Sequence, residues 1–305
     1  MKHSTIILSA AIIAASCSGK MPDTTYEGSA TITVSARPDG EVTSRAAGIN
    51  DDSISKLRIE VYNADGTMDT AGTFTESQSP SLTVSCGKGK LIKVYANFKQ
   101  DEPSDAVFLD SALDGRLAMT GQTVCDISRD TGISVRLRRL VAKITVKGIM
   151  NHTAHDLTIE SVYLTNAVSA IDGGMEEGWS NRMGFESSDY DKFLYSPSGA
   201  VLPSGKGSDD TFTFYTFSNG TDADSHKATW CPRKTRVVLQ SSMLGHIYYY
   251  AITMSYIAAD TEYTIRSVNI TRPGSDSPET AIELNDADAI ITWRHWNDTE
   301  NERTI

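Results

Sequence analysis

The sequence has 305 residues and a formal net charge of −11, because 39 Asp and Glu outnumber 28 Lys and Arg. The basic residues are scattered along the chain instead of forming a stripe, which argues against a nucleic-acid partner. At roughly 150 residues per domain, this length predicts two domains, each with enough chain to bury a hydrophobic core.

The N-terminus has the features of a secretory signal. Lys2 and His3 precede an apolar run, residues 6–15, that is too short to cross a bilayer as a helix. The run ends in Ala14-Ala15-Ser16-Cys17, small residues directly before a cysteine, which resembles the lipobox at which bacterial prelipoproteins are acylated and cut. We predict a lipoprotein signal peptide over residues 1–17 that ends at a lipidated Cys17. The alternative is an ordinary signal peptide with a chance cysteine.

Three further cysteines, Cys86, Cys125 and Cys231, are an odd number for a disulfide framework. A bridge between Cys86 and Cys125 could form in an oxidising compartment, and the state of all three thiols stays open. The sequence contains no CxxC pair, which argues against a zinc site.

The rest of the chain is a succession of short β-branched and aromatic runs separated by Gly, Asn, Asp, Ser and Pro clusters, a pattern typical of β-sandwiches. Residues 30–35 alternate, with Ile32 and Val34 on one face, and residues 57–62 alternate more sharply. The second run leads into Asn63-Ala64-Asp65-Gly66, in which Asp-Gly supplies the positive φ of a tight hairpin. Further strands are predicted at residues 81–86, 91–98, 133–137, 141–146, 157–166, 211–217, 235–240, 246–256 and 263–270, and one weakly periodic helix at 105–118.

A boundary between two domains is predicted near Arg138. Two strand-like runs, 133–137 and 141–146, meet there with no turn residue between them, so the connection should be short and the domains coupled. This divides the mature chain into an N-terminal β-sandwich over residues 18–137 and a C-terminal β-sandwich over residues 138–305. Within the second, the Gly-, Ser- and Asp-rich residues 175–208 predict a long loop or insertion.

Five segments, in a fixed order behind the lipobox, carry a resemblance to a known family. They are LRIEVYNADG at residues 57–66, VRLRRLVAKITV at 135–146, VYLTN at 162–166, TFYTFSN at 213–219, and YTI at 263–265 leading to RPG at 272–274. Together they resemble the fimbrillins, the FimA-type and Mfa-type major pilin and anchor proteins of Bacteroidales. The resemblance covers most of the mature chain.

This resemblance implies an all-β protein with little helix, built as two tandem transthyretin-like Greek-key β-sandwich domains. In stalk subunits of the family, a protease cuts after a basic residue in the loop that follows the first strand, and a strand of a neighbouring subunit replaces the one released. Repetition of this step gives an open head-to-tail polymer. The resemblance therefore implies an outer-membrane lipoprotein precursor that becomes part of a cell-surface fimbrium. Its partners would be other pilin subunits, and its adhesion receptor is unknown.

The sequence has candidate residues for the exchanged strand, the cleavage site and the donor strand. Ile32 and Val34 would form the inward face of the exchanged first strand. Arg45, followed by Ala46, lies after Pro38-Asp39-Gly40 in a predicted accessible loop and is the candidate processing site, although a solvated loop charge is the alternative. Near the C-terminus, residues 289–296 are strand-like, with Ile291 and Trp293 on one face. They form either a donor strand or an ordinary last strand of the second sandwich.

The sequence shows no specific arrangement of catalytic residues. The sequence contains no GxSxG, HExxH, GxxxxGK[ST] or dinucleotide fingerprint. His152 and His155 lie beside Asp156 in a predicted turn without a third ligand, so solvated loop histidines are the expected interpretation. We therefore expect a non-enzymatic protein with no catalytic residue, no metal and no cofactor.

Two alternatives to a pilus stalk subunit stay open. A lipid-anchored fimbrial anchor or tip subunit would keep its first strand and its lipid throughout. A surface glycan-binding lipoprotein would stack sugar rings on Trp179, Tyr190, Phe193 and Tyr195, although these aromatics could equally form a small core of the loop itself.

Overall fold

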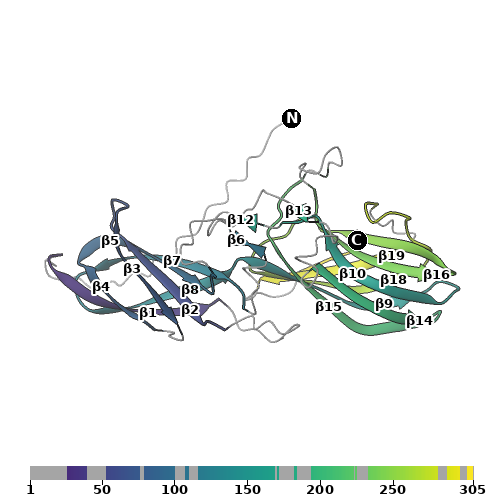
Figure 1. Cartoon of the computed structure of the whole chain (residues 1–305), viewed down its shortest axis with the longest axis horizontal. Coiled ribbons are helices and arrows are strands. Elements are labelled where there is room, and N and C mark those ends of the chain that lie inside the picture. The colour runs from purple at the N-terminus through teal and green to yellow at the C-terminus, as the bar shows by residue number, and fades with distance from the viewer. Residues whose placement is uncertain are drawn as a thin grey trace.

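The computed structural model describes residues 26–39, 53–75, 79–99, 107–109, 116–168, 170–171, 182–183, 194–222, 224, 233–280, 287–295 and 301–304. Their regular secondary structure is almost entirely β-strand, arranged in an elongated molecule with the earlier strands at one end and the later strands at the other (Figure 1).

The strands of the first half are β1 (Ser29–Pro38), β2 (Lys56–Tyr62), β3 (Met68–Thr75), β4 (Ser81–Ser85), β5 (Gly87–Ala96), β6 (Val107–Phe108), β7 (Met119–Ile127) and β8 (Thr131–Arg139). Those of the second half are β9 (Val141–Asn151), β10 (Leu157–Thr165), β11 (Ala167–Val168), β12 (Ala170–Ile171), β13 (Arg182–Met183), β14 (Tyr195–Leu202), β15 (Gly207–Phe217), β16 (Arg236–Met243), β17 (His246–Thr253), β18 (Thr261–Ile270), β19 (Ala287–His295) and β20 (Asn301–Thr304).

The strands predicted from alternation are confirmed, with shifts of a few residues at their ends. The predicted hairpin turn is also present. Gly66 has φ 85° and donates its N–H to the Asn63 carbonyl at 2.9 Å, where β2 turns into β3. The predicted helix differs from the structure: Val107 and Phe108 form the short strand β6, which pairs with β12, and residues 110–115 lie outside the described part.

Apart from β6, the strands of the first half form a single seven-stranded sheet in the order β3-β2-β5-β7-β8-β1-β4. β7 and β8 are paired only through Met119 with Arg139 and Thr120 with Arg138, so the sheet can fold over at that point. Its two edge strands, β3 and β4, meet through hydrogen bonds from Ser85 to Asp69, both 2.9 Å long. The folded sheet thus encloses one hydrophobic core, drawn from residues between Ala30 and Leu137.

The second half contains a four-stranded sheet, β14-β10-β16-β17, and a five-stranded sheet, β15-β9-β18-β19-β20. Buried residues of both sheets, such as Leu239 of β16 and Ile265 of β18, belong to the same core cluster. The two sheets therefore pack face to face as a β-sandwich, which confirms the all-β sandwich class. Only Leu140 separates β8 from β9, so the connection is short, and a domain boundary at Arg138 stays a prediction.

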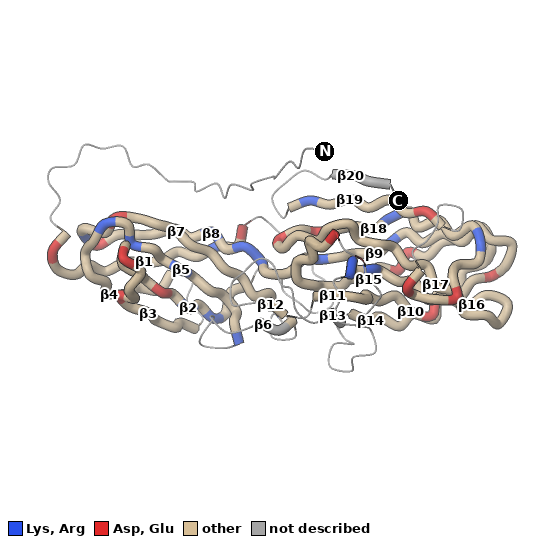
Figure 2. Tube along the Cα trace, turned by 90° about the horizontal axis from the view of Figure 1, so that it is seen from above, with Lys and Arg blue, Asp and Glu red and all other residues tan. Residues whose placement is uncertain are grey.

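Charged residues occur along the chain in both halves of the molecule, with Lys and Arg interspersed among Asp and Glu (Figure 2). In the described residues, no helix has the length and apolar character that crossing a membrane requires.

Candidate functional site around the first strand

β1 lies inside the first sheet, between two strands that follow it much later in the chain. It pairs in parallel with β8, from Ile32 opposite Thr131 to Pro38 opposite Leu137, and antiparallel with β4, from Ser29 opposite Ser85 to Thr33 opposite Ser81. We call the space between β8 and β4 that β1 occupies the β1 slot. Removing β1 would leave unpaired backbone groups along both walls of this slot.

Alternate side chains of β1 point into the core. Ala30 and Ala36 are 3% exposed, and Ile32 and Val34 are fully buried, as the alternating sequence predicts. Each of the two large side chains contributes about 1.5–3 kcal/mol by leaving water. β1 therefore has two apolar anchors at its centre and small residues on either side, and the exchange of this strand stays a prediction.

Side chains from the two ends of β8 bind the backbone at the two ends of β1. Asp130, directly before β8, accepts a hydrogen bond of 2.7 Å from the Thr31 N–H at its Oδ1 atom. Arg139, the last residue of β8, donates a hydrogen bond of 2.8 Å from Nη1 to the Asp39 carbonyl. The Asp39 N–H also donates to the Leu137 carbonyl, at 2.7 Å. The strand is thus fixed at both ends by contacts that involve its backbone.

Arg139 is held by a partner from the second half of the chain. Its buried Nη1 lies 3.1 Å from Oδ1 of Asp260, and its backbone N–H donates to the same oxygen at 3.2 Å. Burial raises the pKa of Asp260, and the neighbouring guanidinium of Arg139 opposes that rise. The Asp260 N–H in turn donates to the Val141 carbonyl. Asp260 therefore links the end of β1 with the start of β9 through Arg139.

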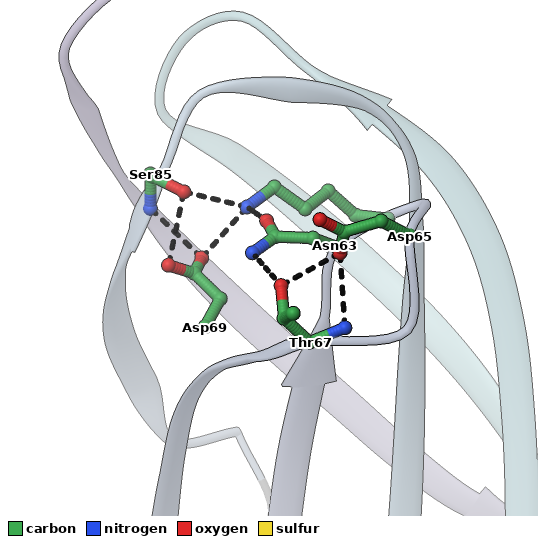
Figure 3. A network of polar contacts seen from close by, with 6 residues as sticks. Asn63, Asp65, Thr67, Asp69 and Ser85 are labelled. Atoms are coloured by element: carbon green, nitrogen blue, oxygen red, sulfur yellow. Dashed lines mark hydrogen bonds and ion pairs between the residues drawn. The ribbon is translucent and has the colours of Figure 1, made fainter.

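A buried lysine holds β4, the other wall of the β1 slot, against β3 (Figure 3). Lys90 is 1% exposed, and its Nζ donates to Asn63 Oδ1 at 2.6 Å, Asp69 Oδ2 at 2.8 Å and Ser85 Oγ at 2.6 Å. Burial by itself would raise the pKa of Asp69, but hydrogen bonds from Lys90 and Ser85 outweigh it and lower that pKa. The network joins the end of β4 to β3 without using any atom of β1.

Sequence reasoning did not identify this lysine. The run Gly87-Lys88-Gly89 suggests a connection between strands, whereas the structure extends β5 back to Gly87. The signal that could have found it is the spacing of Lys90 from Ile92 and Val94, which places all three on the inward face of one strand.

The candidate donor segment lies within its own sheet in this structure. β19 pairs antiparallel with β18 and with β20, and Ile291 is 5% exposed in the second core. Trp293 packs against the same core. The donor role of Ile291 and Trp293 stays a prediction, and donating β19 would require it to leave both neighbours.

Several predicted residues lie outside the described part of the chain. They include the lipidation residue Cys17, the processing pair Arg45 and Ala46, and Cys231. Of the four loop aromatics considered for glycan stacking, Tyr195 is described. It begins β14 and stacks on Tyr163, with ring centroids 6.1 Å apart.

The remaining candidate residues do not come together as a disulfide, catalytic or metal site within the described part of the chain. Cys86 and Cys125 are free thiols, both partly buried against the first core, and burial raises the pKa of Cys125. His152 lies 3.3 Å from the Asn269 side-chain oxygen through its Nε2 atom. Among the residues that the structure describes, no three His, Cys, Asp or Glu side chains gather in a way that could hold a metal ion.

Solved structures share this fold at low sequence identity. A candidate cell adhesion protein of Bacteroides eggerthii has a TM-score of 0.63 at 14% identity, covering 90% of this chain and 98% of that chain. The fimbrilin FimA of Porphyromonas gingivalis has a TM-score of 0.60 at 16% identity, covering 84% and 94%. The tip fimbrial protein Mfa3 of the same species, with a C-terminal truncation, has a TM-score of 0.50 at 11% identity, covering 79% and 95%.

No protein-family model and no curated protein matches the sequence. The similarity to solved structures nevertheless extends over most of this chain and nearly all of each of theirs. The chain therefore has the fold of the Bacteroidales fimbrillins and of the cell adhesion proteins related to them in structure.

Proposed function

We propose that this protein is a structural, non-enzymatic subunit of a cell-surface pilus, assembled by exchange of β1. The observation that carries the proposal is the position of β1: the first strand lies between β8 and β4, with Ile32 and Val34 buried. Cleavage after Arg45, before Ala46, would turn this strand into a separable peptide. The fimbrial proteins among the structural neighbours support the assignment.

Assembly would follow from the physics of sheet edges. Loss of β1 exposes unpaired amides on two strands together with the apolar pocket of its anchors, and a strand from another subunit can satisfy both. The cut peptide gains translational freedom on leaving, which favours replacement by a donor that stays attached to its own subunit. The candidate donor is the C-terminal segment that carries Ile291 and Trp293. This segment forms β19, which would have to leave β18 and β20 to serve as the donor.

The subunit would reach the surface as a lipoprotein through Cys17 and lose its lipid on cleavage at Arg45. A fimbrial anchor is the second candidate, because β1 is paired with β4 from Ser29 to Thr33 and with β8 from Ile32 to Pro38, which also suits a subunit that keeps its first strand permanently. The stacking of Tyr195 on Tyr163 within the protein gives less support to a glycan-binding surface.

Mass spectrometry of the protein recovered from cells separates these candidates. A mature N-terminus at Ala46 is expected for a stalk subunit, whereas a lipidated Cys17 would mean an anchor or receptor.

Limited proteolysis supplies the functional test. The chain without residues 1–17 should be monomeric and should form head-to-tail oligomers after cleavage by an arginine-specific protease. Arg45→Ala should prevent both cleavage and oligomers, while the control Arg136→Ala, at an exposed arginine of β8, should prevent neither. Polymerisation that proceeds unchanged in Arg45→Ala, with β1 still attached, would exclude the proposal.

A further inference from the structure

Whether Asp130 and Arg139 can hydrogen-bond to a strand beside β8 depends on the direction in which that strand runs. Both side chains flank the same strand, β8, so the spacing between them is fixed by that strand. Asp130 offers an acceptor to a backbone N–H, and Arg139 offers a donor to a backbone carbonyl. Neither contact uses a side chain of β1, so both are available to any strand that occupies the β1 slot.

The backbone pattern of β1 shows why direction matters. Asp39 directs its N–H to Leu137 of β8, whereas Val34 directs its N–H to Pro80 on the β4 side. Odd-numbered residues of β1 therefore face β8 with both of their backbone polar groups, and even-numbered residues face β4. When the strand runs parallel to β8, the backbone group beside Asp130 is an N–H. The backbone group beside Arg139 is then a carbonyl.

A strand laid in the opposite direction would present these groups in reverse. Its carbonyl would face the Asp130 carboxylate, and its N–H would face the Arg139 guanidinium. Acceptor would then meet acceptor and donor would meet donor, next to a buried arginine that Asp260 holds in place. The reversed strand loses two charge-assisted hydrogen bonds and gains two unfavourable contacts.

We propose that Asp130 and Arg139 bind the backbone of whichever strand fills the β1 slot and thereby fix its direction and register. The replacing strand must run parallel to β8 and present an N–H and a carbonyl at the positions of Thr31 and Asp39. This inference rests on the proposed function, because it concerns the strand that replaces β1. It identifies the partner as an extended segment selected by backbone groups at its ends and by two apolar side chains at its centre.

The first test measures how fast the cut chain, lacking residues 1–17, releases the segment that ends at Arg45. Asp130→Ala should accelerate release about 3-fold to 10-fold, because the hydrogen bond involves a charged group but lies at the exposed surface. Asp130→Asn keeps an acceptor oxygen but loses the charge, so its release rate should lie between those of the native chain and Asp130→Ala. Thr31→Ala is the matched control, because it changes an exposed side chain and keeps the N–H. Release from Asp130→Ala within twofold of the native rate would overturn the role of Asp130.

The second test adds labelled, amidated peptides in excess to the cut chain and measures their incorporation. The peptide of residues 26–39 should enter the slot, and a nitroxide on its N-terminus should broaden NMR signals near Asp130 and not those near Arg139. A peptide of residues 26–38 lacks the Asp39 carbonyl and should bind at least about tenfold more weakly. Broadening of the signals near Arg139 in place of those near Asp130 would overturn the proposed selection of direction.

Hydrogen exchange on the uncut chain separates this inference from the proposed function. Asp130→Ala should increase the exchange rate of the Thr31 amide about tenfold or more even if the strand never leaves. If the cut chain neither releases its segment nor forms oligomers, the pilus assembly proposal fails. If oligomers form but the Thr31 amide exchanges at the native rate in Asp130→Ala, the assembly proposal stands and the end contacts do not control it.

Discussion

Truncating the two apolar anchors of β1 tests whether this strand is an integral part of the first core. Ile32 and Val34 are both fully buried, so changing both to alanine removes buried methyl groups and leaves a cavity. The two side chains are neighbours on one face and share surroundings, so their effects will not simply add. We expect the free energy of unfolding to fall by about 3–6 kcal/mol. Thr31→Ala, at an exposed position of the same strand, should change it by less than about 0.5 kcal/mol.

The assay is hydrogen exchange resolved along the uncut chain, supported by urea denaturation. Amides of residues 30–35 should be among the protected ones in the native protein. In the double variant they should exchange about 10²-fold to 10⁴-fold faster, because each 1.4 kcal/mol corresponds to a factor of ten. After cleavage at Arg45, the double variant should also release its peptide sooner. If amides 30–35 of the native protein exchange as fast as a disordered tail, the segment is a linker and the anchor or receptor interpretation replaces the stalk.

Three further outcomes follow from the first half of the molecule. Lys90→Met should lower the free energy of unfolding by about 2–4 kcal/mol in urea denaturation, because it leaves the partners of a buried cation without their donor. The folded pKa of Asp69 lies below its unfolded value of about 3.9, so its stabilisation is present above that pH and is lost as the pH falls through the folded pKa. The acid limb of unfolding free energy against pH should therefore be shallower in Lys90→Met, and an unchanged limb would contradict this account. Gly121→Ala would place a Cβ 2.2 Å from the Arg136 carbonyl oxygen and should destabilise by at least about 1–3 kcal/mol. Gly132→Ala, with no atom within 4 Å of the added Cβ, is its control, and equal thermal melting of the two variants would contradict the clash.

Alternation of apolar and polar residues was sufficient to find most strands, because the side-chain period of two is a local property of the backbone. It failed where a strand has little apolar character. β3 is half exposed along its length, β7 has one face of polar and partly exposed residues, and β14 contains Pro197 and Gly199. These segments form strands because neighbours that are already paired supply hydrogen-bonding partners, such as β2 for β3 and β5 for β7.

The sequence by itself determined the all-β class, the hairpin at Gly66 and the inward face of β1, since each depends on residues next to one another in the chain. It also supplied the candidates Cys17 and Arg45, which lie outside the described part of the structure. Only the tertiary structure decided that β1 lies between β8 and β4, that Lys90 ties β4 to β3, and that Asp130 and Arg139 bind the two ends of β1. Strand order and polar contacts such as that of Arg139 with Asp260, 121 positions apart, arise when distant segments bury their apolar faces together. No local pattern of residues specifies which strands become neighbours in that process.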